Sequence, residues 1–194
     1  MRCNYLRVAL VIAFCAAGAS VASAQGNAAI TGFSEDYTDV GPVIGVGNLG
    51  GGDISYGGRF EHGFKPLPNL ANGILSFGVA ADYYHFSSVF NALSGYDWSV
   101  IPIGVTVNYH FHLDNRQIDP FVGVGIGYEH YSVSGPSCVF LGVDYCANAY
   151  SNRTYGIFQA GIRYFWQPKM ALYADAGSGA GSLHVGVMFK VGGN

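Results

Sequence analysis

Two histidines, His110 and His112, lie two residues apart in the segment 101–112. If this segment is a β-strand, both imidazoles lie on one face and could bind one metal ion. A protein metal site needs three or four ligands, and the sequence offers no third ligand at a predictable position. We therefore interpret both histidines as polar lining residues. The sequence predicts no metal, no cofactor and no catalytic group here.

Residues 1–24 have the pattern of a secretory signal peptide. Arg2 and Arg7 come before an apolar run over 8–17. Small residues follow this run and end in an A-x-A cleavage site at Ala24. The apolar run is shorter than the roughly 20 residues of a transmembrane helix. The sequence thus predicts a signal peptide over 1–24 and one domain over 25–194. Without the two arginines that domain is acidic, which gives it no reason to bind nucleic acid.

Two cysteines, Cys138 and Cys146, remain in the predicted exported domain, in a segment rich in Ser, Gly, Pro and Asn. An exported chain meets an oxidising compartment, which favours a local disulfide. A metal site is the weaker alternative, because the pair lacks C-x-x-C spacing and no histidine lies between the two residues. We expect a disulfide that pins the loop 134–152.

The segment 101–112 alternates strictly, with large apolar residues at odd positions and small or polar residues at even positions. Side chains on a strand point alternately to opposite faces, and about ten residues of tilted strand cross a bilayer. One face of this segment therefore suits lipid, and the other carries Thr106, Asn108 and His110. The pattern predicts a membrane-spanning β-strand.

The composition favours the same class of protein. Charged residues make up 11% of the chain, whereas soluble domains contain about 25%. Residues 25–194 contain no apolar run of about 18 residues, so no transmembrane helix is predicted. Because every backbone polar group needs an internal partner in hydrocarbon, the remaining solution is a closed β-barrel.

Period-two alternation and turn residues predict eight strands. They cover residues 41–47, 54–64, 74–86, 101–112, 120–131, 154–166, 170–177 and 182–191. Shorter connections alternate with longer ones, as in outer-membrane barrels, whose long loops face outward from the cell. Eight strands close a barrel that its own side chains can fill. We predict an all-β fold, a single eight-stranded antiparallel transmembrane β-barrel.

Seven charged residues fall on the predicted inward faces, where a barrel can hold charge away from lipid. This predicted lumen network comprises Arg59, Glu61, Asp82, Glu129, Arg163, Asp175 and Lys190. Opposite charges must pair there to offset their desolvation. The network is then either a structural plug of salt bridges or a polar path for small solutes.

Aromatic residues gather near the predicted strand ends and predict two interfacial girdles. One comprises Phe60, Phe64, Tyr109, Phe111, Phe121, Tyr164, Trp166 and Phe189, and the other comprises Tyr83, Trp98, Tyr128, Tyr131 and Tyr155. A soluble barrel would bury such rings and place its charges outside, which is the inverse of this pattern.

The chain resembles the small eight-stranded outer-membrane β-barrels, including the opacity-type and OmpA/OmpW-like proteins. The resemblance rests on the signal peptide, on the paired segments 101–111 and 119–128, and on the final segment 187–191. It implies a barrel in the bacterial outer membrane, and it does not imply one activity.

A second, local resemblance concerns His85 and Ser87. Outer-membrane lipid A deacylases use a His-x-Ser pair on the outer barrel surface, where the histidine activates the serine and a carboxylate orients the histidine. Asp97 is the acid nearest in the sequence, but the flanking residues do not match that family. A lipid A-modifying hydrolase is therefore the lesser alternative.

The sequence favours a non-enzymatic outer-membrane protein with a surface-interaction or structural role and a lumen filled by side chains. The alternative is a channel for small or apolar solutes, like the OmpW-type porins. The expected partners are outer-membrane lipid and lipopolysaccharide, the barrel-insertion machinery, and an extracellular ligand at the loop 134–152, because ordered loops on rigid scaffolds often carry binding. We expect a monomer.

Overall fold

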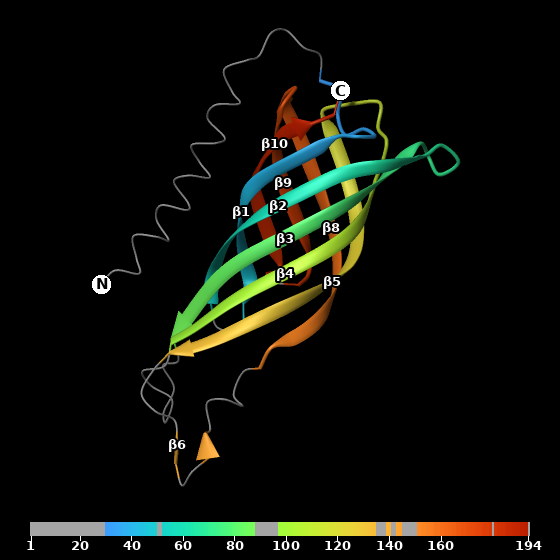
Figure 1. The fold of residues 1–194 in the computed structure, drawn as a ribbon. Helices are drawn as coiled ribbons and strands as arrows, with labels where there is room; N and C mark the ends of the chain where they lie inside the picture. Colours follow the sequence, from blue (N-terminus) through green and yellow to red (C-terminus); the bar gives the residue numbers. More distant parts are fainter. Residues whose placement is uncertain are drawn as a thin grey trace.

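Eight long strands close into one antiparallel barrel, in the order β1-β10-β9-β8-β5-β4-β3-β2 (Figure 1). The computed structural model describes residues 30–49, 52–87, 97–134, 139–140, 143–144, 151–179 and 181–193. None of the described residues forms a helix long and apolar enough to cross a membrane. The predicted fold class is confirmed.

Each predicted strand is present, and all of the barrel strands except β10, which keeps its predicted length, are longer than the sequence pattern predicts. The barrel strands are β1 (Thr38–Leu49), β2 (Gly52–Leu67), β3 (Gly73–Ser87), β4 (Asp97–His110), β5 (Ile118–Ser134), β8 (Arg153–Gln167), β9 (Met170–Ser178) and β10 (Leu183–Gly192). The two-residue strands β6 (Val139–Phe140) and β7 (Val143–Asp144) pair with each other in the connection from β5 to β8.

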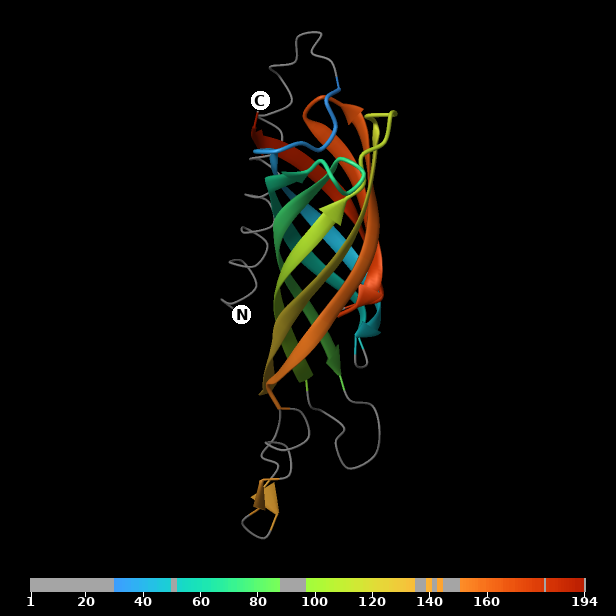
Figure 2. The ribbon, with the colours of Figure 1, turned by 90° about the vertical axis from the view of Figure 1, so that its right-hand side faces the viewer.

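The two ends of the barrel differ. At one end, here called the turn end, short turns join β2 to β3, β4 to β5 and β8 to β9, and the chain enters β1 and leaves β10 (Figure 1). The opposite end, called the loop end, carries the remaining connections. There β3, β4 and β5 extend beyond β1 and β2 (Figures 1 and 2). The β2–β3 pairing stops at Tyr83, whereas β3 pairs with β4 as far as Ser87.

The alternation that identified β4 holds along the whole strand. Every even residue from Trp98 to His110 is buried, and the odd residues are exposed or partly exposed. Exposed apolar side chains continue around the outer wall, for example Val124 on β5, Phe158 on β8 and Leu172 on β9. A protein with so large an apolar surface would aggregate in water, whereas this surface matches the hydrocarbon of a lipid bilayer.

Four of the predicted girdle residues point into the barrel. They are Trp98 and Phe121, Tyr131, whose hydroxyl donates to Glu129, and Tyr155, which lines the lumen cavity. Trp98 and Phe121 are each 1% exposed, so the prediction that they face lipid is wrong. Trp98 lies at an even position of β4 and Phe121 at an odd position of β5, which are the inward positions of these strands. We predicted them in the girdle because they lie near strand ends. The direction of a side chain depends instead on whether its position along the strand is odd or even.

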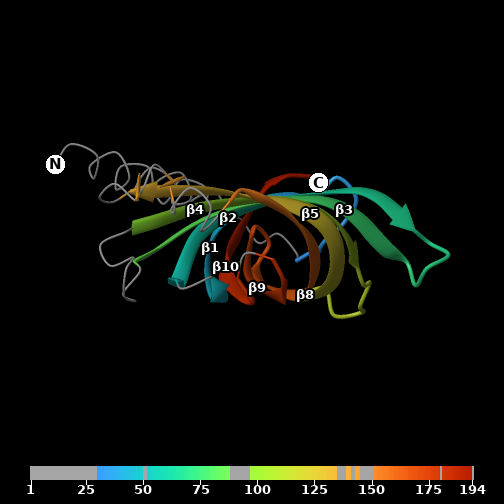
Figure 3. The same cartoon turned by 90° about the horizontal axis from the view of Figure 1, so that it is seen from below.

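Glycines on the inner face allow neighbouring strands to approach closely in this narrow ring, which Figure 3 shows from below. A Cβ added to Gly41 would overlap the backbone carbonyl oxygen of Val187 on β10. A Cβ added to Gly125 would overlap the carbonyl oxygen of Val105 on β4 in the same way. Side chains at these two positions would prevent the curvature that closes the barrel.

The outer wall makes a first testable prediction. Replacing Val124 with arginine should destabilise the folded barrel by about 2–4 kcal/mol, because charge on the lipid face is costly at mid-depth. Val124 is 56% exposed near the middle of β5. Urea unfolding in lipid vesicles measures the change, with Val124→Ala as the matched control. Equal stability of the two variants would contradict a lipid-facing position for this residue.

Candidate functional site

Arg163 lies at the centre of the turn-end half of the lumen and is fully buried. Its guanidinium bonds three carboxylates from three other strands. Nε donates to Asp39 Oδ2 at 3.1 Å, Nη1 donates to Asp119 Oδ2 at 3.3 Å, and Nη2 donates to Glu61 Oε2. Asp119 is the cross-strand neighbour of Arg163, and Asp39 is that of Glu61. These pairings tie β1, β2, β5 and β8 together through the lumen.

His110 on β4 joins the same carboxylates. Its Nδ1 lies 2.9 Å from Asp119 Oδ1 and its Nε2 lies 2.7 Å from Glu61 Oε1. Ionised carboxylate oxygens only accept hydrogen bonds, so each ring nitrogen carries a hydrogen and the imidazole is a cation. We call Asp39, Glu61, His110, Asp119 and Arg163 the Arg163 cluster. It combines two cations with three carboxylates.

Neutral side chains complete the bonding of Glu61. Asn108 Nδ2 donates to Glu61 Oε1 at 2.7 Å, and the Ser76 hydroxyl donates to the same oxygen. Gln159 Nε2 in turn donates to Asn108 Oδ1 at 2.9 Å. A buried carboxylate with this many donors is well compensated for its lost hydration.

The N-terminal segment 30–37 covers the cluster at the turn end. The Phe33 ring stacks on the His110 ring with centroids 3.7 Å apart, and Arg163 Cζ lies 5.1 Å from the Phe33 centroid. The Tyr37 ring contacts Phe33 at 4.8 Å. Burial and the neighbouring Asp39 carboxylate raise the pKa of Tyr37, so its hydroxyl stays protonated. Aromatic rings thus seal the polar cluster from the turn end.

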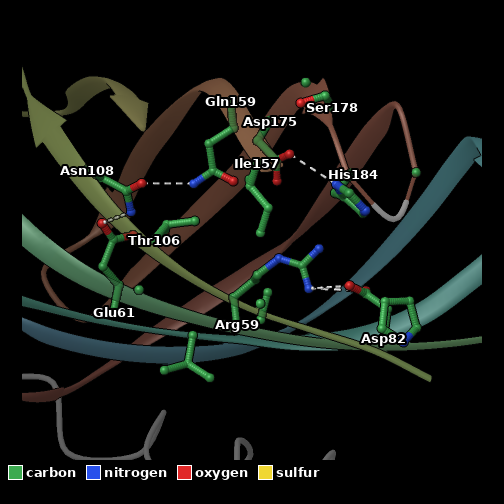
Figure 4. A pocket seen from close by; sticks show the side chains of 18 of the residues that line it. Arg59, Glu61, Asp82, Thr106, Asn108, Ile157, Gln159, Asp175, Ser178 and His184 are labelled. Atoms are coloured by element: carbon green, nitrogen blue, oxygen red, sulfur yellow. Dashed lines mark hydrogen bonds and ion pairs between the residues drawn. The ribbon is translucent and has the colours of Figure 1, made fainter. Parts of the chain in front are cut away.

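The loop-end half of the lumen holds two separate ion pairs around a small cavity (Figure 4). Arg59 Nη1 lies 3.0 Å from Asp82 Oδ2, and His184 Nδ1 lies 3.0 Å from Asp175 Oδ1. The cavity has a volume of about 50 Å³ and extends to Glu61 and Asn108. Its polar lining and size suit a few water molecules.

A third ion pair lies closer to the loop end. Arg153 Nε donates to Glu129 Oε2, and the Tyr131 hydroxyl donates to the same oxygen at 2.6 Å. The side chain of Arg153 is 62% exposed, whereas that of Glu129 is only 2% exposed. Solvent therefore reaches this pair from the loop end.

The predicted lumen residues do not form one network. Arg59 meets Asp82, and Arg163 meets Glu61. Glu129 and Asp175 instead pair with Arg153 and His184, which the prediction did not include. The Lys190 ammonium lies 5.4 Å from the centre of the Tyr37 ring. His112, expected beside His110, follows the end of β4 and lies 2.9 Å from Arg116.

Sequence reasoning missed Asp39, Asp119 and the N-terminal segment. Asp39 has the parity of Gly41 and Val43, and Asp119 has that of Phe121, so longer strands would have placed both carboxylates in the lumen. Segment 30–37 has no alternation that could have revealed it.

Several predictions fall on residues outside the described ranges. They are the signal peptide 1–24, the disulfide between Cys138 and Cys146, and most of the loop 134–152. Within the described ranges, no three His, Cys, Asp or Glu residues form a group that could hold a metal ion.

The hydrolase alternative can be compared with the geometry at the loop end. His85, Ser87 and Asp97 are exposed on the outer face of β3 and β4. The Ser87 hydroxyl donates to Asp97 Oδ1 at 2.6 Å, and His85 Nε2 lies 4.0 Å from that oxygen. In a hydrolytic triad the serine bonds the histidine and the carboxylate orients the histidine. Here the serine bonds the carboxylate, which does not favour a nucleophilic role.

A closed ring of eight antiparallel strands, an apolar outer wall and an ion-paired lumen define a small transmembrane β-barrel of the outer-membrane type. Solved structures share this fold. A designed transmembrane β-barrel matches with a TM-score of 0.52 and 14% identity, over 82% of this chain and 99% of that chain. OprG of Pseudomonas aeruginosa matches with a TM-score of 0.51 and 11% identity, over 84% and 97%.

The N-terminal β-barrel domain of Pseudomonas aeruginosa OprF is also similar, with a TM-score of 0.48 and 13% identity, over 80% of this chain and 98% of that chain. No model of a protein family matches the sequence, and no curated protein matches it significantly. The likeness to the designed barrel and to OprG shows the fold, as the sequence resemblance predicts.

Proposed function

We propose that this protein is a non-enzymatic barrel of the bacterial outer membrane whose lumen is sealed and whose role lies at its surface. The apolar outer wall supports a position in a bilayer, and the barrel fold supports the outer membrane, where such barrels occur. The lumen is then a structural support that holds the loop end in shape.

The observation that carries this proposal is the complete burial of Arg163 among Asp39, Glu61 and Asp119. These side chains come from four strands and meet inside the lumen, where the aromatic rings of the N-terminal segment cover them. Buried charges with this many partners hold one arrangement, because each alternative leaves a charge uncompensated. A lumen closed in this way does not pass ions.

Planar bilayer recordings test the proposal. The refolded wild-type barrel should produce no stepwise conductance, while its migration on a detergent gel should change with heating, as expected of a folded barrel. A conducting porin serves as the positive control, and cell fractionation should recover the protein with the outer membrane. Stepwise wild-type conductance would overturn the sealed lumen, and recovery in the soluble fraction would overturn the membrane assignment.

The partners follow from this proposal. Outer-membrane lipid and lipopolysaccharide would contact the outer wall, and the barrel-insertion machinery would assemble the protein. An extracellular ligand would bind the loop 134–152, where we propose the disulfide between Cys138 and Cys146. We propose a monomeric state.

Passage of small solutes is the second candidate function. The cavity of about 50 Å³ in the loop-end half favours it, because a polar space already occupies part of the lumen. Swelling of vesicles that contain the barrel, in solutions of small amino acids or sugars, would support this function over the sealed lumen.

A further inference from the structure

The cavity in the loop-end half of the lumen contains a buried carboxylate oxygen that lacks a partner. Asp175 on β9 uses Oδ1 for its pair with His184, whereas its Oδ2 is buried and has no hydrogen-bond partner among the described residues. The Asp175 side chain lines the cavity, as Figure 4 shows. A buried acceptor without a donor is costly. A molecule in the cavity that donates a hydrogen bond to Oδ2 would remove this cost.

The guanidinium of Arg59 on β2 brings donors to the same cavity (Figure 4). Its hydrogen bonds to described residues all come from Nη1, which donates to the Asp82 carboxylate and to the carbonyl oxygen of Gly58. The N–H groups on Nε and Nη2 can therefore bond a ligand in the cavity. The Arg59 guanidinium also interacts electrostatically with Asp175. A donor cation and an acceptor anion thus face one small space.

This cavity is closed on the side of the turn end. It stops at Glu61 and Asn108, where the fully buried Arg163 and its partners fill the lumen. In the other direction it borders Gly177 and Ser178, which are exposed at the loop-end terminus of β9. The cavity is therefore a blind pocket that faces the loop end, and the Arg163 cluster keeps a bound molecule from passing through.

We propose that this pocket binds a small zwitterionic amino acid such as glycine, with the ligand carboxylate on Arg59 and the ligand ammonium on Asp175. Guanidinium N–H groups bond carboxylates strongly, and an ammonium donates hydrogen bonds without accepting any. A ligand with only one of these charges would leave either the Asp175 oxygen or the Arg59 donors unpaired. The volume of about 50 Å³ holds about four atoms of the size of a water molecule, which restricts the ligand to the smallest amino acids. The proposal rests on the proposed function in one respect, since the sealed lumen makes the pocket blind.

Calorimetric titration of the refolded barrel in detergent micelles tests the pocket. Glycine should bind saturably, whereas acetate and methylammonium, which each carry one of its two charges, should bind at least about tenfold more weakly. Asp175→Asn should weaken glycine binding by about 10- to 100-fold, the usual worth of a hydrogen bond between charged groups. Ala80→Leu adds apolar bulk to the cavity wall, retains both ion pairs and should abolish binding. Arg153→Gln is the matched control and should bind like the wild type, because Arg153 belongs to a loop-end ion pair that does not line the cavity.

A wild-type barrel that does not bind glycine saturably, or that binds glycine and acetate equally, would overturn the pocket and leave the sealed lumen intact. Wild-type glycine affinity in Asp175→Asn would do the same, as would an equal loss of affinity in Arg153→Gln. If Asp175→Asn loses its heat-modifiable migration, Ala80→Leu decides, and wild-type affinity in that variant overturns the pocket. Passage of labelled glycine through the wild-type barrel in vesicles would instead overturn the sealed lumen of the proposed function.

Discussion

Replacing Arg163 with methionine is expected to destabilise the barrel by about 3–5 kcal/mol, the usual cost of removing one partner from a buried ion-pair network. The substitution leaves Asp39, Glu61 and Asp119 facing one another with His110 as the remaining cation of the cluster. Arg163→Lys should recover only part of the loss, because an ammonium cannot reproduce the fork of the guanidinium.

Urea unfolding in lipid vesicles, followed by tryptophan fluorescence, measures this loss. The matched control is Lys65→Met, which removes an exposed cation from β2 and should change stability by less than about 1 kcal/mol. If Arg163→Met and Lys65→Met unfolded at the same urea concentration, the cluster would not be what holds the lumen together.

Replacing Gly41 with alanine is expected to prevent stable closure of the barrel. The new Cβ would overlap the carbonyl oxygen of Val187 on β10, the strand that pairs with β1 to close the ring. This oxygen belongs to the backbone and cannot move away as a flexible side chain could. We expect a loss of about 3 kcal/mol or more, at the severe end of overpacking.

Gly58→Ala is the matched control, since its Cβ would meet its nearest neighbour, the carbonyl oxygen of Gly41, at 3.8 Å. The fraction of refolded protein with heat-modifiable migration should fall sharply for Gly41→Ala and stay at the wild-type level for Gly58→Ala. Equal folded fractions would mean that the seam between β1 and β10 tolerates a wider spacing than the structure shows.

Local alternation was sufficient to predict the fold and the inward direction of individual side chains. Thr106, Asn108 and His110 face the lumen because the period of a strand is two, whatever lies on the other strands. The strand ends were less predictable. Asp119 lies just before the predicted strand 120–131, although β5 begins at Ile118.

The partners of each charge could not be predicted in the same way. Arg163 on β8 meets Glu61 on β2, which is 102 residues away in the sequence and on a strand that does not pair with β8. Which side chains lie at the same height along the barrel axis depends on strand tilt and on the stagger accumulated around the ring. Alternation in the sequence predicts whether a side chain points inward or outward. Its height along the barrel axis depends on how all the strands close into the barrel.

The extension of β3, β4 and β5 at the loop end makes the barrel rim uneven. Beyond Tyr83, where pairing with β2 ends, β3 continues for four residues to Ser87, a length of roughly 13 Å along the strand. The outward residues of this extension include His85 and Ser87, in contrast to the apolar wall below. The strand ends on this side of the loop end therefore lie farther from the apolar wall than those on the other side. Under the proposed surface role, a large ligand that approaches the loop end would meet this side first.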